Sequence, residues 1–348
     1  MKIFSPVEIV KRYATLKNHR IYTMPIVILM PHSRCNCRCV MCDIWKGNNN
    51  LQQLEESDIE KLLSSLKTFK TKLVVMSGGE ALMHPNFFGL CDILRSRKIK
   101  ITILSTGLLL KKYAEEIIAK TDEVIVSLDG SQEVHDKIRN IPDTFNKLKE
   151  GVRELKNLNK EYRVTARCVI QKANFKDLPN IVDAAKDIGL DQISFLNADV
   201  STDAFNRPNL WEDEKVGEVK LSLQEVAQFK EIIENLIKTH SKDFKSGFIA
   251  ESPEKLRRFY NYYAAFHGLC DFPTVTCNAP WVSTVIEADG SVRPCFFHAK
   301  IGNIRESTLT ESINSPGSIA FRKNLDTTTN PICKKCVCSL NLSPLAKL

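Results

Sequence analysis

The chain lacks long hydrophobic runs, an export signal and a dense basic block. No stretch approaches the ~18 consecutive apolar residues that a membrane-spanning helix needs. Charged residues are spread through residues 1–20, so the continuous apolar core of a signal peptide is missing. Lysine and arginine form no block interleaved with aromatic residues, which argues against nucleic acid as a partner. We therefore expect a cytoplasmic protein that binds neither membranes nor nucleic acid.

The composition is otherwise that of a globular protein. With 348 residues, 43 % of them hydrophobic, the chain can form one large α/β domain and a smaller one. The formal net charge of +8 comes from scattered lysine and arginine, which attract anions only weakly. Twelve cysteines in a chain without an export signal indicate a reducing compartment, where cysteines bind metals instead of forming disulfides.

The most informative cysteines lie on one short stretch after an apolar run. Cys35, Cys39 and Cys42 have the spacing Cys-x3-Cys-x2-Cys, and Cys37 does not fit it. Three thiolates this close can hold three irons of one iron–sulfur cube and leave the fourth iron without a protein ligand. A metal with a vacant position can bind and polarise a small molecule. The alternatives are a zinc site completed by His32 or Cys37, disulfides, or inert cysteines.

A second motif, Gly78-Gly79-Glu80, follows another apolar stretch. This order of motifs resembles the radical S-adenosylmethionine (SAM) superfamily. In that superfamily the open iron of a 4Fe–4S cluster binds the amino and carboxylate groups of SAM, and Gly-Gly-Glu holds the amino group. Glycines permit close backbone approach, and Glu80 can accept a charge-assisted hydrogen bond from an ammonium. The resemblance implies that the cysteine triad ligates the SAM-binding cluster and that Gly78, Gly79 and Glu80 contact SAM.

Further SAM contacts are implied by position. The pattern Ser-Leu-Asp-Gly followed by His-Asp-x-Ile-Arg, which begins at Ser127 and ends at Arg139, resembles radical SAM enzymes with C-terminal cluster domains. In those enzymes the serine lies near the SAM ribose, so Ser127 is the ribose candidate and Arg139 belongs to the same site. The tripeptide Ser105-Thr106-Gly107 stands where relatives often have Thr-Asn-Gly, so Thr106 is a ligand candidate, although a turn explains the glycine equally well. Leu196 ends a strand beside the expected adenine position.

Three more polar residues stand near predicted strand ends. A turn explains Asp129 and the glycine after it as well as a functional role does. Arg167 and Asn174 are near the end of the fifth predicted strand, within reach of SAM or of a substrate.

Strand and helix patterns alternate six times between residues 25 and 240. The predicted strands are Ile26–Met30, Lys72–Met76, Lys100–Leu104, Glu123–Leu128, Arg163–Ile170 and Gln192–Leu196. Apolar residues at helical spacing predict a helix after each strand, and Ser57 with Glu60 form a capping-box pattern before the first of these helices. Such alternation predicts an α/β fold with a parallel sheet, outer helices and chemistry in the loops after the strands. Six units give a partial (β/α)6 TIM-type barrel over residues 25–240, after a lead-in of residues 1–24, and the resemblance implies the same fold.

Residues 241–348 are predicted to form a small cysteine-rich β-hairpin domain. An Asp-Gly turn between two apolar strand patterns is a strong hairpin signal. Cys277 and Cys295 flank this hairpin, and Cys333-x2-Cys336 supplies a second pair. Four thiolates can enclose one metal centre completely, either a 4Fe–4S cluster or a structural zinc.

This arrangement resembles the twitch domain, the shorter relative of the SPASM domain in radical SAM enzymes. SPASM domains continue with further spaced cysteines and hold two clusters, whereas only Cys338 follows here. The resemblance therefore implies one auxiliary 4Fe–4S cluster and leaves Cys270 and Cys338 unassigned. Four cysteines are its expected ligands: Cys277, Cys295, Cys333 and Cys336.

The predicted function is that of a two-cluster radical enzyme. As the resemblance implies, the reduced N-terminal cluster transfers an electron to SAM, and homolytic cleavage gives methionine and a 5′-deoxyadenosyl radical that abstracts hydrogen from a substrate. The auxiliary cluster assists by electron transfer or substrate binding, and a flavodoxin or ferredoxin is the expected electron donor. The substrate is a small metabolite or a peptide. The alternatives are a zinc-stabilised binding module, which the Gly-Gly-Glu motif disfavours, and an iron–sulfur electron carrier, which would not need six β–α units.

Overall fold

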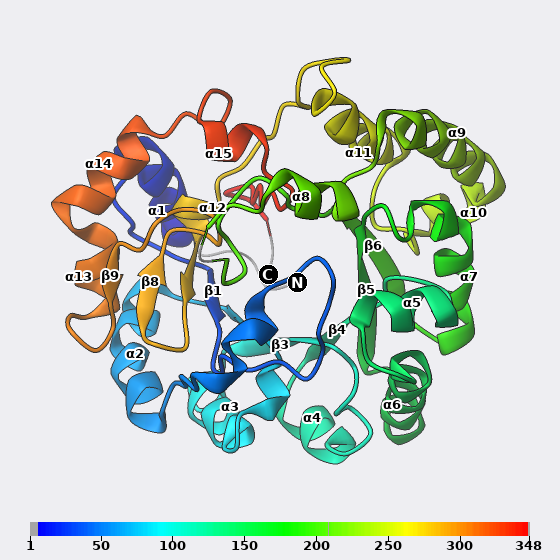
Figure 1. The fold of residues 1–348 in the computed structure, drawn as a ribbon. Coiled ribbons are helices and arrows are strands. Elements are labelled where there is room, and N and C mark those ends of the chain that lie inside the picture. Colours follow the sequence, from blue (N-terminus) through cyan, green and yellow to red (C-terminus); the bar gives the residue numbers. More distant parts are fainter. Residues whose placement is uncertain (1–5, 208, 347–348) are drawn as a thin grey trace.

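The sheet of this protein is continuous from the first predicted unit to the C-terminal hairpin. A computed structural model describes residues 6–207 and 209–346; the first five residues of the lead-in and the last two of the C-terminal region lie outside it. Nine strands form one sheet in the order β6-β5-β4-β3-β2-β1-β7-β8-β9. The strands are β1 Ile26–Leu29, β2 Leu73–Met76, β3 Lys100–Ser105, β4 Glu123–Ser127, β5 Arg163–Ile170, β6 Gln192–Asn197, β7 Ser283–Ile286, β8 Ser291–Arg293 and β9 Gly302–Asn303. Strands β1 to β6 run parallel and form a curved sheet, with the loop after β1 on its inner side (Figure 1).

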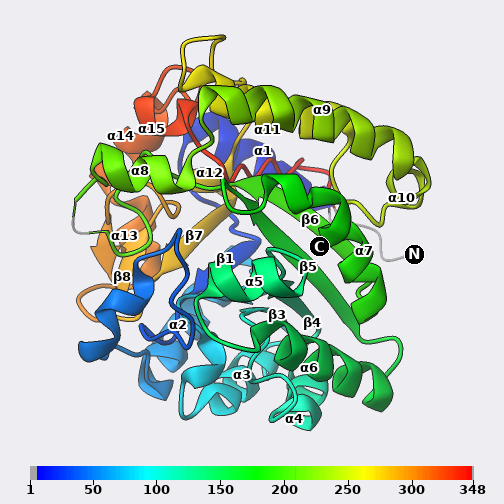
Figure 2. The same ribbon diagram turned by 45° about the vertical axis from the view of Figure 1, so that its right-hand side comes forward.

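Helices cover the outer side of this curved sheet, as both views show (Figures 1 and 2). The α-helices are α1 Pro6–Asn18, α2 Glu56–Phe69, α3 Phe87–Arg95, α4 Ala114–Lys120, α5 Gln132–Arg139, α6 Thr144–Leu158, α7 Leu178–Ile188, α8 Asp213–Val219, α9 Leu223–Thr239, α10 Ser241–Ser246, α11 Pro253–Ala265, α12 Ala279–Val282, α13 Leu309–Asn314, α14 Pro316–Asn324 and α15 Pro331–Lys334. Short 3-10 helices are η1 Ile44–Asn49, η2 Ala81–Met83 and η3 Phe175–Asp177. Among the described residues, no helix is both long and apolar enough to cross a bilayer. The predicted α/β fold with a parallel sheet and outer helices is confirmed.

The two faces of the sheet have different roles, because side chains alternate along each strand. In β4, Val124 and Val126 are buried in the main apolar cluster, and Ile125 and Ser127 between and after them are only half-buried. Successive side chains of a strand point to opposite faces, so the buried set packs against the helices and the other set faces the centre of the ring. The hydrophobic core therefore lies between sheet and helices, and the inner face can carry polar residues.

Local patterns gave most helices but not all of their boundaries. The predicted capping box at Ser57 and Glu60 is wrong: Glu55 and Asp58 form the box, and α2 begins at Glu56. Helix α8 was not predicted, and α5 lies in the stretch between Ser127 and Arg139 that we considered only for its motif. Both are short and polar, so they lack the apolar stripe on which the prediction depended.

The C-terminal hairpin extends the barrel sheet. Strand β7 pairs with β1 in parallel, with Ile26 opposite Ser283 and Leu29 opposite Ile286. Strand β8 then returns antiparallel through the predicted turn, where Gly290 has a φ of +84°. The two regions expected as separate domains thus share one sheet, and the boundary near residue 241 stays a prediction.

The end of the chain closes the barrel at the amino ends of the strands. Leu340 and Leu342 belong to an apolar cluster that includes Ile26, Trp281 and the inner-face residues of β1 and β2. Asn278 fixes this tail, since its backbone NH donates to the Leu340 carbonyl (2.7 Å) and its side chain exchanges two hydrogen bonds with Leu342 (2.8 and 2.9 Å). The opposite end of the barrel, at the carboxyl ends of the strands, carries the predicted motifs.

Candidate active site

The cysteine triad lies on the loop between β1 and α2, and the end of α5 holds that loop. The backbone NH groups of Arg38 and Val40 donate to the carbonyls of Arg139 (3.0 Å) and Ile138 (3.1 Å). The last carbonyls of a helix have no intrahelical partner, so they are free to accept these bonds. The triad is thereby fixed to the segment that follows β4.

The two glycines of the Gly-Gly-Glu motif make room for the cysteine loop. A Cβ on Gly79 would overlap the carbonyl oxygen of Arg34, 2.6 Å from its carbonyl carbon, and would lie 3.0 Å from the Cβ of Cys35. Gly78 has a φ of +122°, which an L side chain rarely adopts, and its Cβ would lie 3.0 Å from the His32 carbonyl oxygen. The glycines are therefore required to seat Cys35 at the strand end; their contact with SAM stays a prediction.

Glu80 is fully buried and bonded to the end of β3. Its carboxylate accepts hydrogen bonds from the Ser105 hydroxyl (3.1 Å), from the NH and hydroxyl of Thr106 (2.7 Å each) and from the Leu82 NH (3.2 Å). Burial raises the pKa of Glu80, and these hydrogen bonds oppose the rise. The Thr106 hydroxyl also lies 3.0 Å from the side-chain oxygen of Asn36 in the cysteine loop. A bond from Glu80 to the SAM amino group would have to share oxygens that already hold the site together.

A buried cation lies beside the triad. Nη1 of Arg139 is 3.5 Å from Sγ of Cys39. A hydrogen bond from the Cys37 thiol and, against the effect of burial, the charge of Arg139 lower the pKa of Cys39 to about 7. Burial raises the pKa of Cys35 and of Cys42 to about 12. Burial disfavours the charged thiolate form of the three cysteines, and the buried guanidinium of Arg139 offsets this cost. The site therefore fits an anionic cluster that is ligated by thiolates.

Asp129 orients this cation and is more than a turn residue. Its carboxylate is fully buried, forms an ion pair with Arg139 and accepts a hydrogen bond from the Val169 NH (2.8 Å). Burial raises the pKa of Asp129, and Arg139 opposes the rise. The Asn174 amide donates to the Asp129 carbonyl (2.8 Å) and to the Val169 carbonyl (3.0 Å), so Asn174 has a structural role here.

The other predicted SAM contacts lie on the inner side of neighbouring strands. Ser127 ends β4 opposite Arg167 of β5, and Leu196 of β6 lies opposite Val169; all four are half-buried. The structure thus brings Ser127, Leu196 and the triad to the same end of the barrel. Their contacts with SAM stay predictions.

The four expected auxiliary cysteines line one recess together with Cys338 and His298. Burial raises the pKa of Cys295 to about 11 and that of Cys333 to about 12. His298, whose Nε2 lies 3.3 Å from Sγ of Cys333, was missed in the sequence although it follows Cys295 by three positions. Over residues 6–207 and 209–346, no three His, Cys, Asp or Glu side chains converge tightly enough to hold a single metal ion. Cys270 is exposed and does not line the recess.

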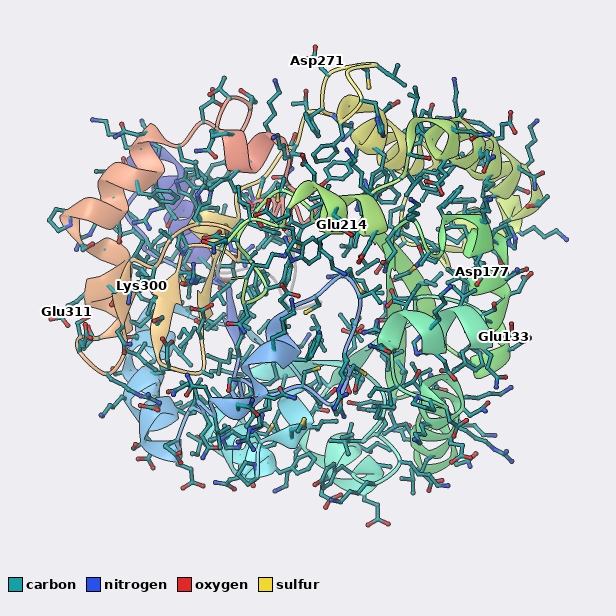
Figure 3. All side chains as sticks on the ribbon, viewed as in Figure 1. Glu133, Asp177, Glu214, Asp271, Lys300 and Glu311 are labelled. Atoms are coloured by element: carbon teal, nitrogen blue, oxygen red, sulfur yellow. The ribbon has the colours of Figure 1, made fainter. Side chains whose placement is uncertain are left out.

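A segment that no local pattern predicted crosses the carboxyl end of the barrel and contacts the cysteine loop. We call residues 199–207 and 209–219 the strap; it carries α8 and Glu214 across the centre of the view in Figure 3. Arg207 forms a fully buried ion pair with Asp199 (2.7 Å), and its guanidinium lies 3.8 Å from the centre of the Trp211 ring. The Trp211 indole NH donates to Oδ2 of Asp43 (2.9 Å), the residue after Cys42. The strap is therefore tied directly to the triad loop.

Known proteins share these features. The model of the Radical SAM superfamily matches residues 29–185, and a model described as an iron–sulfur cluster-binding domain (SPASM) matches residues 277–337. The Fe-coproporphyrin III synthase of Methanosarcina barkeri is 25 % identical over 313 residues, covering 82 % of this chain and 73 % of that protein. The subtilosin biosynthesis protein AlbA of Bacillus subtilis is 24 % identical over 290 residues, covering 81 % of this chain but only 58 % of its own length.

A solved structure shares the fold. SuiB of Streptococcus suis, bound to its precursor peptide SuiA, superposes with a TM-score of 0.64 at 17 % identity and covers 95 % of this chain and 74 % of SuiB. The two domain matches contain the cysteine triad with its Gly-Gly-Glu motif and the four expected auxiliary cysteines. The chain belongs to the radical SAM superfamily: it is an enzyme that uses SAM and 4Fe–4S clusters and carries a C-terminal SPASM/twitch domain.

Proposed function

We propose that this enzyme abstracts a hydrogen atom from a substrate that enters the barrel at the carboxyl ends of its strands. When bound, SAM and the reduced cluster supply a 5′-deoxyadenosyl radical for this step. The observation that carries the proposal is the seat of Cys35 against Gly79, with Glu80 and Thr106 directly behind it. This contact places the triad at the carboxyl ends of the strands, next to the half-buried side chains on the inner face of the sheet.

We assign the residues as follows. Cys35, Cys39 and Cys42 hold the cluster that binds SAM, and Arg139 balances its charge through Cys39. Bound SAM would be held at the strand ends by seven residues: Gly78, Gly79, Glu80, Thr106, Ser127, Arg139 and Leu196. The buried Asp129 fixes Arg139 in this role, because an ion-paired and hydrogen-bonded carboxylate leaves the guanidinium little freedom.

The auxiliary cluster is bound by Cys277, Cys295, Cys333 and Cys336. The recess that these thiols line supports this assignment. When bound there, a 4Fe–4S cluster would supply a centre that can accept an electron from the substrate or bind it, and hydrogen bonds and enclosure by these residues would set its potential. A flavodoxin or ferredoxin is the proposed electron donor for the enzyme.

A small carboxylate-bearing molecule is the first substrate to test. One relative, which aligns with 82 % of this chain and over 73 % of its own length, is named Fe-coproporphyrin III synthase. The compound in that name carries carboxylate side chains. A peptide is the second candidate, because AlbA is named for bacteriocin biosynthesis and SuiB was solved with a precursor peptide.

The experiment measures 5′-deoxyadenosine by mass spectrometry in the reconstituted, dithionite-reduced enzyme. Because a synthase forms the compound in its name, an iron tetrapyrrole carboxylic acid other than Fe-coproporphyrin III, deuterated on its side chains, is offered first, and a peptide library second. Deuterium in 5′-deoxyadenosine is the expected result for the true substrate class. If SAM were consumed but no substrate hydrogen ever entered 5′-deoxyadenosine, hydrogen abstraction as the function would be rejected.

A further inference from the structure

The inner face of β5 carries a cation that the SAM site does not use. Arg167 lies between Ser127 of β4 and Ser194 of β6 in the strand register, and it is half-buried. Among the described residues, its guanidinium makes one hydrogen bond, from Nε to the Ser194 hydroxyl (3.4 Å), and has no ion-pair partner within 4.0 Å. The two terminal nitrogens, which form the fork that binds carboxylates, are free to bind a ligand.

A second cation approaches from α11. Nζ of Lys255 lies 3.4 Å from Oε1 of Glu251, and more than half of the Lys255 side chain is accessible to solvent. The other oxygen of Glu251 accepts a hydrogen bond from the Phe195 NH of β6 (3.0 Å). Burial raises the pKa of Glu251, and both Lys255 and Arg167 oppose the rise. Glu251 thus joins α11 to β6, the strand whose Ser194 accepts the hydrogen bond of Arg167, and a single carboxylate can balance only one of the two cations.

We propose that Arg167 and Lys255 form a subsite that binds a carboxylate group of the substrate at the inner face of the barrel, beside the SAM site. This inference rests on the proposed function, since it specifies the substrate of the same site. A carboxylate fits better than a phosphate monoester, because one unpaired positive charge matches a monoanion. The Ser194 hydroxyl accepts the hydrogen bond from Nε of Arg167 and donates to the Ala166 carbonyl (3.1 Å), so it positions the guanidinium and leaves the two terminal nitrogens for the ligand.

The test measures equilibrium binding to the reconstituted protein in two matched pairs of probes. Coproporphyrin III is compared with its uncharged tetramethyl ester by absorbance, and a glutamate-containing octapeptide with its glutamine counterpart by calorimetry. In at least one of the two pairs, the probe with free carboxylates should bind more tightly than its uncharged counterpart. Arg167→Gln and Lys255→Gln should each weaken that acid form by roughly tenfold or more, as expected for a charge-assisted hydrogen bond, and leave the neutral form unchanged. Arg163→Gln, at the exposed start of the same strand, is the matched control and should change neither.

Several outcomes would overturn the subsite. These are equal binding of acid and neutral forms in both pairs, unchanged binding in Arg167→Gln, a loss of SAM affinity in Arg167→Gln, and displacement of the acid probe by inorganic phosphate at lower concentration than by acetate. Iron content and the denaturation midpoint of each variant establish that it is folded and loaded, and Arg167→Lys, which keeps the charge but not the fork, should bind at an intermediate level. Failure of the parent protein to cleave SAM without substrate would instead reject the proposed function, so the two failures are distinguishable.

Discussion

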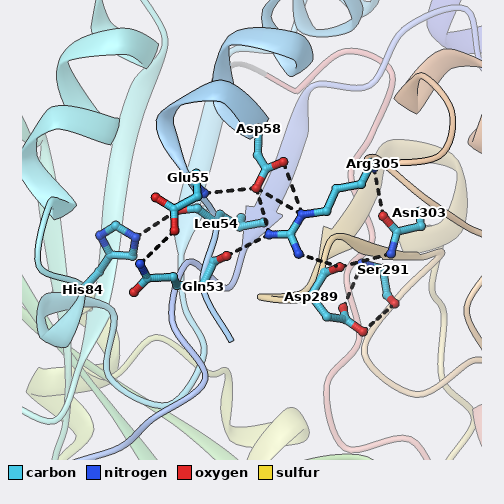
Figure 4. Close-up of polar contacts among 9 residues, drawn as sticks. All are labelled: Gln53, Leu54, Glu55, Asp58, His84, Asp289, Ser291, Asn303 and Arg305. Carbon is cyan, nitrogen blue, oxygen red and sulfur yellow. Dashed lines mark hydrogen bonds and ion pairs between the residues drawn. The ribbon is translucent and has the colours of Figure 1, made fainter. Parts of the chain in front are cut away.

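Arg305 and Asp58 form a two-pronged ion pair that fastens the C-terminal region to the barrel (Figure 4). Nη2 of Arg305 lies 2.9 Å from Oδ2 of Asp58, and Nε lies 3.3 Å from both carboxylate oxygens. Nη2 also donates to the carbonyl of Gln53 (2.8 Å), and Asp58 accepts the NH of Glu55 in the capping box of α2 (3.0 Å). One side chain after β9 thus fixes the segment through which the cysteine loop enters α2.

We call the ion pair between Arg305 and Asp58 the clamp; its removal should destabilise the folded protein. Arg305→Ala leaves Asp58, a buried carboxylate, without its cation, and we expect a loss of about 1–2 kcal/mol in the free energy of unfolding, reduced by the partial exposure of Arg305. Urea denaturation followed by circular dichroism measures the loss. Arg163→Ala removes an ion pair with Glu123 that is more exposed, and it should cost less than about 1 kcal/mol. Equal losses in the two variants would mean that the clamp has no special role.

Gly79 should be indispensable for one cluster only. In Gly79→Ala the new Cβ overlaps the Arg34 carbonyl, so the triad loop must move and the SAM-binding cluster should be lost. Iron should fall from about eight to about four per chain in reconstituted protein, as counted by Mössbauer spectroscopy. Gly217→Ala on α8 meets nothing within 4 Å and should keep full iron. A Gly79→Ala protein with both clusters would show that the loop does not need this close approach.

Cys338 should be dispensable for the auxiliary cluster, whereas Cys333 should not. All five cysteines line the recess, but Cys336 and Cys338 are separated by one residue, and Sγ of Cys336 points to the Cys338 carbonyl (3.4 Å). Cys333→Ala should therefore lose one cube and Cys338→Ala none. Mössbauer spectra of the two variants decide the assignment. Loss of the cube in Cys338→Ala with retention in a Cys336→Ala protein would exchange their roles.

Stability should fall on mild acidification because of His135. Burial and the charge of Arg139 lower the pKa of His135 to about 3, against a weaker opposing effect of Asp136. The folded pKa lies below the unfolded value of about 6.5, so the unfolded chain binds the extra proton and stability is lost as the pH falls below about 6.5. His135 alone should cost about 1.4 kcal/mol between pH 7.5 and 5.5. Urea midpoints across this range should show a shallower pH dependence in His135→Gln; an unchanged slope would assign the titration to other groups.

Sequence patterns predicted what is local in this fold. The six strand and helix units follow from apolar periodicity, and the cysteine sets follow from spacing within short segments. Three features depend on pairings between distant parts of the chain and had no local signal: the parallel pairing of β7 with β1, the clamp between Arg305 and Asp58, and the bond from Trp211 to Asp43.

For the motif glycines, the structure shows a reason for glycine that the sequence did not indicate. Close backbone approach to a ligand stays a prediction, and the structure adds a second reason for the glycine, because Gly79 passes close to the Arg34 carbonyl. Likewise, the carboxylate of Glu80 binds Ser105 and Thr106, contacts that require β2 and β3 to be neighbours. A residue type can be read from a motif, whereas its partners are set by the packing of elements.

The central claim is that the triad of Cys35, Cys39 and Cys42 carries the SAM chemistry. The direct measurement is the yield of 5′-deoxyadenosine and methionine from SAM in the anaerobically reconstituted, dithionite-reduced protein. The parent should form both products slowly without substrate, and a variant with all three cysteines changed to alanine should form neither, although it retains about four irons in the auxiliary cube. Formation of 5′-deoxyadenosine by the triple variant, or its absence from a parent that holds about eight irons, would contradict this account.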